Sequence, residues 1–126
     1  MNLQPLIRLC GNATAGLVLM LGLVQGRTSE RLVSETVSFY DQIKPLFAIR
    51  CYKCHTGENP KGGLLLDSHE HALAGGKSAE AVITPGESDR SALVRRITSS
   101  DPDEQMPPKG PRLTEKEVLR IRQWID

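Results

Sequence analysis

Apolar residues recur with helical spacing before the middle of the chain and predict its first helix. The residues concerned are Phe39, Ile43, Leu46 and Phe47. Positions separated by four, seven and eight residues share one face of a helix, and this face runs toward Cys51. Pro45 has no N–H to donate, so the helix is expected to kink or restart there. The pattern therefore predicts a folded domain that begins near Ser38 with an interrupted helix.

A second apolar stripe, near the C-terminal end, predicts the last helix. Its members are Val118, Ile121, Trp124 and Ile125. Thr114 and Glu117 have the spacing of a capping box at the start of this helix. Leu113 can pack onto Val118 as a hydrophobic staple. The sequence ends at Asp126 without a C-terminal cap, which is consistent with a natural chain that continues and a domain truncated at this point.

The stretch between these two helices is expected to be mostly loop, with two short helices in it. Ser68 can cap a brief helix that stops at Gly75, because serine favours helix starts and glycine favours helix ends. Ser88 can cap a second short helix, which carries Leu93 and Ile97 on one face. The rest of the stretch between the first and last helices contains several turns with glycine and proline.

The N-terminal residues have the pattern of a secretory signal peptide, assigned to residues 1–26. Arg8 supplies a positive start, and the apolar run from Ala13 to Val24 is too short for a comfortable membrane span. An uncleaved anchor is the main competing interpretation, and the chain is expected at a membrane only in that case. Residues 27–37 are polar and predicted to be a linker, and residues 38–126 are predicted to form one domain. The protein is therefore expected to be exported to the periplasm or cell envelope.

Composition adds an argument for a bound prosthetic group. After the leader is removed, about 100 residues remain, which suits one small domain. Hydrophobic residues make up 39% of the chain and aromatic residues 4%. A hydrophobic core made of protein alone would therefore be small, and a bound metal or prosthetic group would help to stabilise it. Removing Arg8 leaves 15 basic and 15 acidic residues, 15 − 15 = 0. This balance gives no sign of a nucleic acid partner and no overall field to steer a charged redox partner.

The chemistry is carried by Cys51-Tyr52-Lys53-Cys54-His55, which has the C-x-x-C-H spacing of c-type haem attachment. Two thiols at this spacing can reach the two vinyl groups of one porphyrin, and the adjoining imidazole then lies under the iron. Cys51 and Cys54 are accordingly predicted to bind one haem c covalently, with His55 as the proximal iron ligand. Cys10 precedes the apolar run and is expected to leave with the leader.

Other uses of the cysteine pair remain open at this stage. A thioredoxin-like redox pair would need a preceding strand, and none of sufficient length is predicted before Cys51. A zinc site could recruit Cys51, Cys54, His69 and His71, although the His-x-His spacing is tighter than usual for zinc. A disulfide, or a chance occurrence of the motif in an ordinary domain, is a further alternative.

Met106 is the predicted distal iron ligand. It is the one methionine outside the leader, and it lies in Met106-Pro107-Pro108 between polar residues rather than on an apolar face that would bury it for packing alone. The prolines limit the freedom of the loop and would hold a weak thioether ligand at low entropic cost. His69, His71 or an open iron are the alternatives. Methionine ligation raises the reduction potential and closes the iron, which suits electron transfer, whereas an open iron would permit gas binding or peroxidase chemistry.

From Val37 to Asp126 the chain resembles the planctomycete cytochrome c domain, a small family related to class I c-type cytochromes. The stretches that carry the resemblance are Ile43-Lys44-Pro45-Leu46, the C-x-x-C-H motif, Gly62-Gly63-Leu64-Leu65-Leu66-Asp67, Ala72-Leu73-Ala74-Gly75-Gly76, Pro85-Gly86-Glu87-Ser88, Leu93-Val94-Arg95-Arg96-Ile97, Asp101-Pro102-Asp103, Met106-Pro107-Pro108 and Trp124-Ile125-Asp126.

The resemblance implies an all-α, cytochrome c-like fold of three to four short helices around one covalently bound haem. The first and last helices would cross, with aromatic residues between them. It further implies an electron carrier rather than an enzyme, an unidentified redox partner protein, and a domain that usually stands at the N-terminus of much longer exported proteins. The competing functions are a haem enzyme or gas sensor with an open iron, and a structural domain held by zinc or a disulfide.

Overall fold

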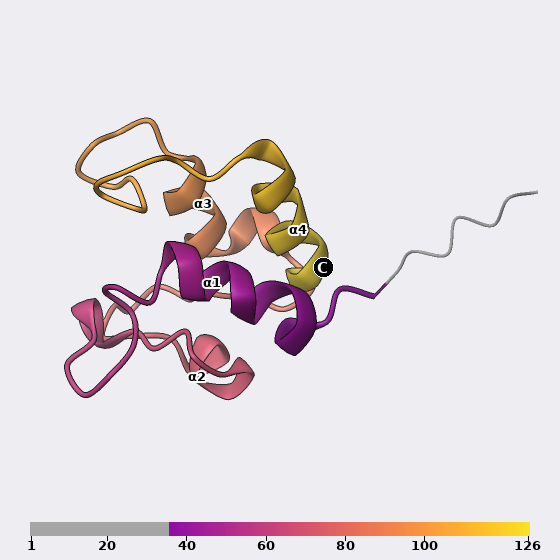
Figure 1. The fold of residues 1–126 in the computed structure, drawn as a ribbon, viewed down its shortest axis with the longest axis horizontal. Coiled ribbons are helices and arrows are strands. Elements are labelled where there is room, and N and C mark those ends of the chain that lie inside the picture. Colours follow the sequence, from indigo (N-terminus) through magenta and orange to yellow (C-terminus); the bar gives the residue numbers. More distant parts are fainter. Residues whose placement is uncertain (1–35) are drawn as a thin grey trace, which may run out of the picture. The chain divides into compact units, whose positions relative to one another are not determined.

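The computed structural model describes residues 36–126, so the predicted signal peptide and nearly all of the predicted linker lie outside the described residues. Four α-helices and no strands are present in this part of the chain (Figure 1). They are α1 (Lys44–Arg50), α2 (His69–Ala74), α3 (Ala92–Thr98) and α4 (Glu115–Ile125). The expected all-α fold of short helices is confirmed. None of the described helices is long and apolar enough to cross a membrane.

The first helix is interrupted where the sequence predicts it. A π-helical turn, η1 (Phe39–Ile43), precedes α1, and the N–H of Lys44 donates to the carbonyl of Phe39 across the wide turn. Pro45 follows at the start of α1, where a residue without an N–H costs no helical hydrogen bond. The helix therefore restarts at the proline.

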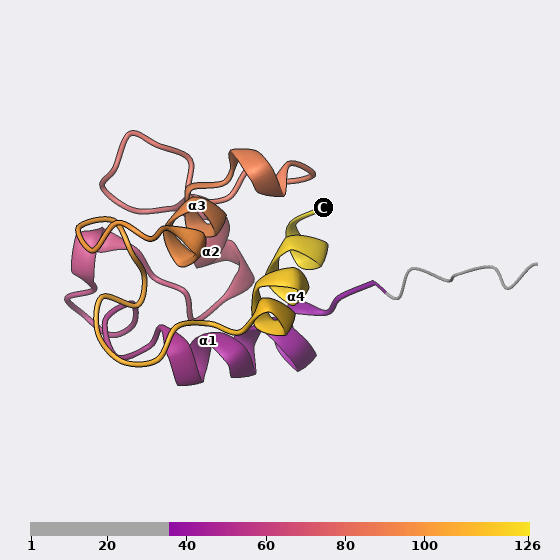
Figure 2. The ribbon, with the colours of Figure 1, turned by 90° about the horizontal axis from the view of Figure 1, so that it is seen from above.

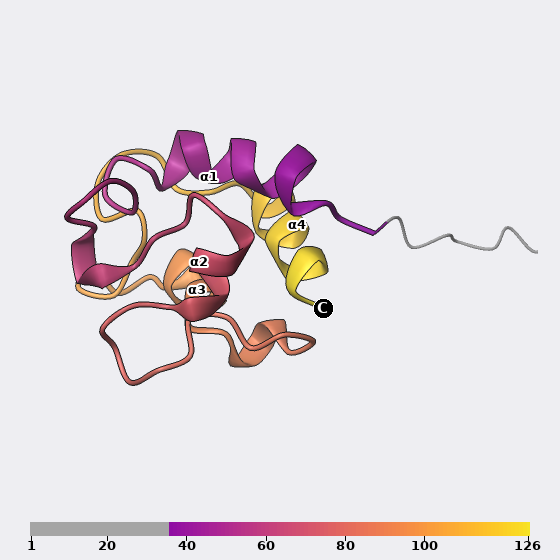
Figure 3. The same ribbon diagram turned by 90° about the horizontal axis from the view of Figure 1, so that it is seen from below.

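The last helix packs across the first helical segment, and aromatic rings fill the crossing. Contacts join α4 to η1, and the crossing can be followed in Figures 1 and 3. The Trp124 ring lies 5.4 Å from that of Phe39 and 6.1 Å from that of Phe47, measured between centroids. Phe47 and Ile121 are fully buried. The apolar stripes predicted for the two helices thus face each other, and this contact forms the main hydrophobic core.

Helices α4 and α2 have the capping residues that the sequence predicts for them. Thr114 and Glu117 form the predicted capping box at α4, and Leu113 and Val118 both pack against the core. Ser68 caps α2, because its hydroxyl accepts a hydrogen bond from the N–H of His71 at 3.1 Å. Gly75, at φ 76°, ends that helix as predicted.

The prediction that Ser88 caps α3 is wrong. Ser88 begins a separate 3₁₀ turn, η3 (Ser88–Arg90), and α3 starts only after Ser91. The Ser88 N–H and hydroxyl instead donate to the two carboxylate oxygens of Asp126, at 2.7 and 2.8 Å. The Ser91 hydroxyl accepts from the N–H of Thr84 at 2.9 Å. Ser88, which the local sequence assigns to α3 as a cap, therefore binds the Asp126 carboxylate at the end of α4.

Candidate functional site

A cavity of about 870 Å³ lies among the loops that follow α1 and precede α4. Its walls are mainly apolar and include Leu64, Leu66, Val82, Leu93, Ile97 and Leu113. The four residues predicted to hold the cofactor, Cys51, Cys54, His55 and Met106, all line this one cavity. The two loops that supply them lie beyond the C-terminal end of α1 in all three ribbon views (Figures 1 to 3). The fold thus brings together the two segments on which the sequence places the chemistry.

The C-x-x-C-H motif forms a tight turn at the end of α1. The N–H of Cys51 still donates to the carbonyl of Phe47, at 2.7 Å, so the first cysteine is held by the helix. The carbonyl of Cys51 accepts the N–H groups of Cys54, at 3.1 Å, and His55, at 3.0 Å. The His55 carbonyl in turn accepts the N–H of Leu66 at 2.9 Å. Backbone hydrogen bonds therefore fix the motif at both of its ends.

The imidazole of His55 is oriented by one hydrogen-bonding contact. Its Nδ1 atom lies 3.3 Å from the carbonyl oxygen of Leu64, and a carbonyl can only accept, so Nδ1 carries the proton in this contact. That tautomer leaves the Nε2 lone pair available to a metal. The pKa of His55 is lowered, mainly because its burial disfavours the charged ring. The lowered pKa favours the neutral imidazole that metal ligation needs, although the hydrogen bond to Leu64 by itself acts in the opposite direction.

The environment of Cys51 is unsuited to thiol–disulfide exchange. Cys51 and Cys54 are free and half-buried. Burial raises the pKa of Cys51 to about 12, against the opposing charge of Arg50 and with a further increase from Cys54. Redox-active cysteines have a lowered pKa, because the thiolate is the reactive form. The described residues also contain no strand that could precede the pair in a thioredoxin-like unit, so the structure disfavours that alternative.

The loop that carries Met106 is fastened to the C-terminal end of α3. The N–H of Met106 donates to the carbonyl of Arg96 at 2.9 Å. The Arg112 guanidinium donates to the carbonyl of Ser99 at 2.5 Å and to the side-chain oxygen of Gln105. Met106 is half-buried and packs against the core, so the expectation that it has no apolar neighbours is wrong. Polar residues flank it in sequence, but the cavity wall supplies its apolar surroundings.

Residues 51–110 match the family model of planctomycete cytochrome C. The chain is similar to this family over these residues. The matched range begins at the C-x-x-C-H motif and includes the Met106 loop, so it takes in both segments that bring the predicted ligands to the cavity. Similarity to a cytochrome c family suggests haem binding and electron transfer. A comparison with curated proteins and one with solved structures gave no match.

The cavity fits one haem in size and in chemistry. Cofactor sites commonly measure about 300 to 1,000 Å³ and have mostly apolar walls, and the cavity lies within that range. Its donor set is a thiol pair, an imidazole and a thioether, which is the set that a covalently attached haem with two axial ligands requires.

The structure places His69 and His71 elsewhere. Neither belongs to the cavity lining. The ring of His69 packs in the aromatic cluster, 6.0 Å from that of Trp124. His71 is exposed, and its Nδ1 lies 2.6 Å from an oxygen of Asp67. No group of three or more His, Cys, Asp and Glu side chains in residues 36–126 could hold a metal ion, so the zinc alternative has no ligand set there.

One residue of the cavity lining was missed in the sequence. Arg96 lies on α3 among lining residues that include Leu93 and Ile97. The signal was available, because Arg96 is three residues after Leu93 and shares its side of a helix. A basic residue within an apolar helical stripe is unusual, and it indicates a nearby anionic group or an edge of the core.

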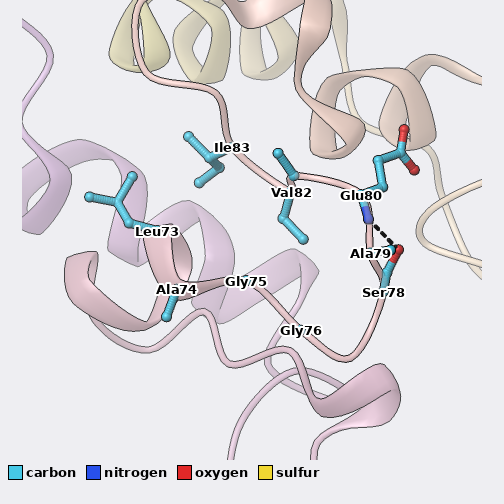
Figure 4. Close-up of a pocket in the computed structure, with 10 residues that line it drawn as sticks. Leu73, Ala74, Gly75, Gly76, Ser78, Ala79, Glu80, Val82 and Ile83 are labelled. Carbon is cyan, nitrogen blue, oxygen red and sulfur yellow. Dashed lines mark hydrogen bonds between the residues drawn. The ribbon is translucent and has the colours of Figure 1, made fainter.

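A second, smaller hollow of about 300 Å³ lies beside the loop that follows α2 (Figure 4). Its lining runs from Leu73 to Ile83 and is largely backbone and small side chains. Figure 4 shows the one hydrogen bond in this group, from the N–H of Glu80 to the hydroxyl of Ser78, at 3.1 Å. Glu80 is the only titratable side chain among these residues, so the hollow lacks the donors of a catalytic or metal site.

Proposed function

We propose that the chain is an exported c-type cytochrome domain that binds one haem covalently through Cys51 and Cys54 and carries electrons. His55 and Met106 hold the iron from its two sides in this proposal. The observation that carries it is the convergence of all four residues on one apolar cavity of about 870 Å³. The match to the family model over residues 51–110 supports the haem and the electron transfer, and the shared cavity supports the choice of these four residues.

Each part of the chain has a distinct task in this function. Bound haem supplies a one-electron iron couple whose potential depends on its axial ligands. The Leu64 carbonyl orients the His55 ring, and the hydrogen bond from Met106 to Arg96 holds the thioether loop beside the cavity. Apolar walls keep water from the cavity and so favour a raised potential. With both axial positions filled, no position is left for a substrate, which suits an electron carrier rather than an enzyme.

Export and partnership belong to the same proposal. The signal-like residues 1–26 support export to the periplasm or cell envelope, where covalent attachment retains the haem. The electron donor and acceptor are expected to be a redox partner protein or further domains of a longer chain. Membrane attachment follows only if the leader stays uncleaved. No nucleic acid partner is expected, because acidic and basic residues are balanced after the leader.

The test is the absorption spectrum of the chain, exported in a host with cytochrome c maturation machinery. A reduced c-type spectrum that stays with the polypeptide after denaturation in alkaline pyridine is the expected result. The variant in which Cys51 and Cys54 are both replaced by alanine is the control and should lose covalent haem. Haem that remains attached to this variant after solvent extraction would overturn the attachment. A colourless wild-type protein would overturn the proposed function itself.

A further inference from the structure

The charged residues in the lining of the haem cavity are strongly unbalanced, although the domain as a whole is neutral. The basic residues in the lining are Arg50, Lys53, Lys61, Arg96 and Lys109, and the one carboxylate is that of Glu80. Arg50 is already bound to Glu117, with hydrogen bonds of 3.0 and 3.2 Å. The three lysines are exposed, so water solvates their ammonium groups without a protein partner.

Arg96 is the basic residue in this lining that is partly buried and has no protein partner among the described residues. It is half-buried on α3, and within residues 36–126 its guanidinium makes no hydrogen bond or ion pair. The acidic residue of the lining is Glu80, whose pKa is lowered mainly by its hydrogen bond to Arg95 and further by the charges of Arg95 and Arg96. Arg95 holds that carboxylate through two hydrogen bonds and also lies 3.5 Å from Glu104.

Arg95 thus binds the Glu80 carboxylate, and no carboxylate of residues 36–126 forms an ion pair with Arg96. A partly buried charge without a partner is unfavourable, because burial removes water that the protein does not replace. An anion brought into the cavity would remove this penalty. The cofactor of the proposed function carries two propionate carboxylates, and the planar fork of a guanidinium matches a carboxylate with two parallel hydrogen bonds.

We propose that the Arg96 guanidinium binds a propionate carboxylate of the haem. The inference rests on the proposed haem site and adds to it a residue that orients the cofactor. The same residue accepts the N–H of Met106 through its backbone carbonyl. Arg96 therefore joins the carboxylate side of the cofactor to the loop of the distal ligand, and it acts as a positioning residue for both.

The experiment uses the full chain, matured with haem, and compares Arg96→Gln with the wild type. The readouts are the propionate bending band in the resonance Raman spectrum, which responds to hydrogen bonds on the carboxylate, and the midpoint potential. Arg96→Gln should shift the band and lower the potential, because loss of a nearby positive charge favours the ferric state. Arg96→Lys retains the charge and should restore most of the potential. Arg90→Gln is the matched control, because Arg90 is 73% exposed, is ion-paired with Glu87 and lies outside the cavity lining.

Each outcome decides the proposal. If Arg96→Gln leaves the band and the potential at their wild-type values, or moves them no more than Arg90→Gln does, the proposal is wrong. If Arg96→Gln takes up no haem but Arg96→Lys does, the positive charge is needed and the proposal stands. If neither variant takes up haem, charge is not what the position supplies, and the proposal falls. Failure of the haem site itself would appear instead in the wild type, as a protein without a c-type spectrum.

Discussion

Met106 combines two roles that are usually separate in a small domain. Its side chain packs against the hydrophobic core and also lines the cavity, while its N–H is bound to α3. A thioether is soft and adaptable in packing, and the same sulfur is a ligand that raises the potential of haem iron. Packing thus holds the sulfur at the cavity wall in the folded domain.

Replacing Met106 with alanine is expected to lower the reduction potential and to open the iron. The weak far-red band of methionine-ligated ferric haem should disappear, and carbon monoxide should bind the ferrous protein without displacing a ligand. Absorption spectra and a redox titration of the matured protein check this. An unchanged ferric spectrum would remove Met106 from the site. Carbon monoxide binding by the wild type without a ligand switch would instead favour the open-iron function.

Glu117 is the residue that joins the start of α4 to the first helix. Its carboxylate accepts from the N–H of Thr114 at 2.7 Å and from Arg50 at 3.0 and 3.2 Å. The hydrogen bond from the Thr114 backbone, followed by the bond from Arg50, lowers the pKa of Glu117. Ionised Glu117 therefore stabilises the folded state above the unfolded-state pKa, and this contribution is lost as the pH falls through the lower folded pKa.

Glu117→Gln is expected to reduce the free energy of unfolding by about 1 to 2 kcal/mol at neutral pH, because it removes charged hydrogen bonds from a side chain that is mostly shielded. The difference from the wild type should shrink in acid, where the wild-type carboxyl is also neutral. Denaturant unfolding of both proteins at neutral and acidic pH measures this difference in the free energy of unfolding. Glu115→Gln, which removes an exposed first-turn carboxylate of the same helix, should have a smaller effect. A difference that persists unchanged in acid would show that the charge of Glu117 is not responsible.

The loop between α3 and α4 has no helix of its own, and Arg112 supplies much of its attachment. The Arg112 guanidinium donates to the carbonyls of Ile97 and Ser99 at the end of α3, at 3.5 and 2.5 Å. These carbonyls have no helical partner, and the negative end of the helix favours a cation there. The loop that carries Met106 is therefore anchored by a residue six positions beyond it.

Arg112→Ala should weaken methionine ligation by about 1 to 2 kcal/mol, because one to three hydrogen bonds of the loop are lost. The far-red band of the ferric protein should disappear at a lower temperature than in the wild type, by roughly 4 to 8 °C per kcal/mol for a domain of this size. Lys109→Ala removes an exposed basic residue of the same loop and serves as the control. Equal thermal loss of the band in both variants would contradict the role of Arg112.

The helices that the sequence predicts correctly are those whose start signals are local. Thr114 and Glu117 are three residues apart, and Ser68 lies three residues before the N–H that it caps. Ser88 has the same type of side chain, but its partner Asp126 is 38 residues away. A capping rule considers only the next turn of the chain, so it assigned Ser88 to α3 and placed the start of that helix too early.

The whole domain is held by the crossing of α4 with the first helical segment, and Trp124 is central to that contact. Its ring neighbours are Phe39, Phe47 and His69. Trp124→Ala should reduce the free energy of unfolding by about 3 kcal/mol, at the lower end of the range for large aromatic residues because the ring is only half-buried. Tyr40→Ala is the comparison, since Tyr40 is 57% exposed and should cost less than about 1 kcal/mol. A loss below about 1 kcal/mol for Trp124→Ala would show that the crossing does not depend on this ring.

The residues of the candidate site that belong to short sequence motifs could be predicted from the sequence. The C-x-x-C-H motif and the Met-Pro-Pro loop are each visible in a few residues, and the structure brings both to one cavity. The position of His69 in the aromatic cluster depends on contacts between distant segments, so local sequence could not predict it. Ligation of the iron by Met106 stays a prediction until a spectrum is recorded.

The size of the cavity has a consequence for the life of the protein in the cell. A small domain is stable by only about 5 to 15 kcal/mol, and we expect a mainly apolar cavity of about 870 Å³ to leave the polypeptide unstable until a cofactor fills it. Under the proposed function, chains that leave the export machinery without haem would stay unfolded and be degraded by envelope proteases. The steady amount of this protein would then report the haem supply of the compartment, independently of how strongly its gene is expressed.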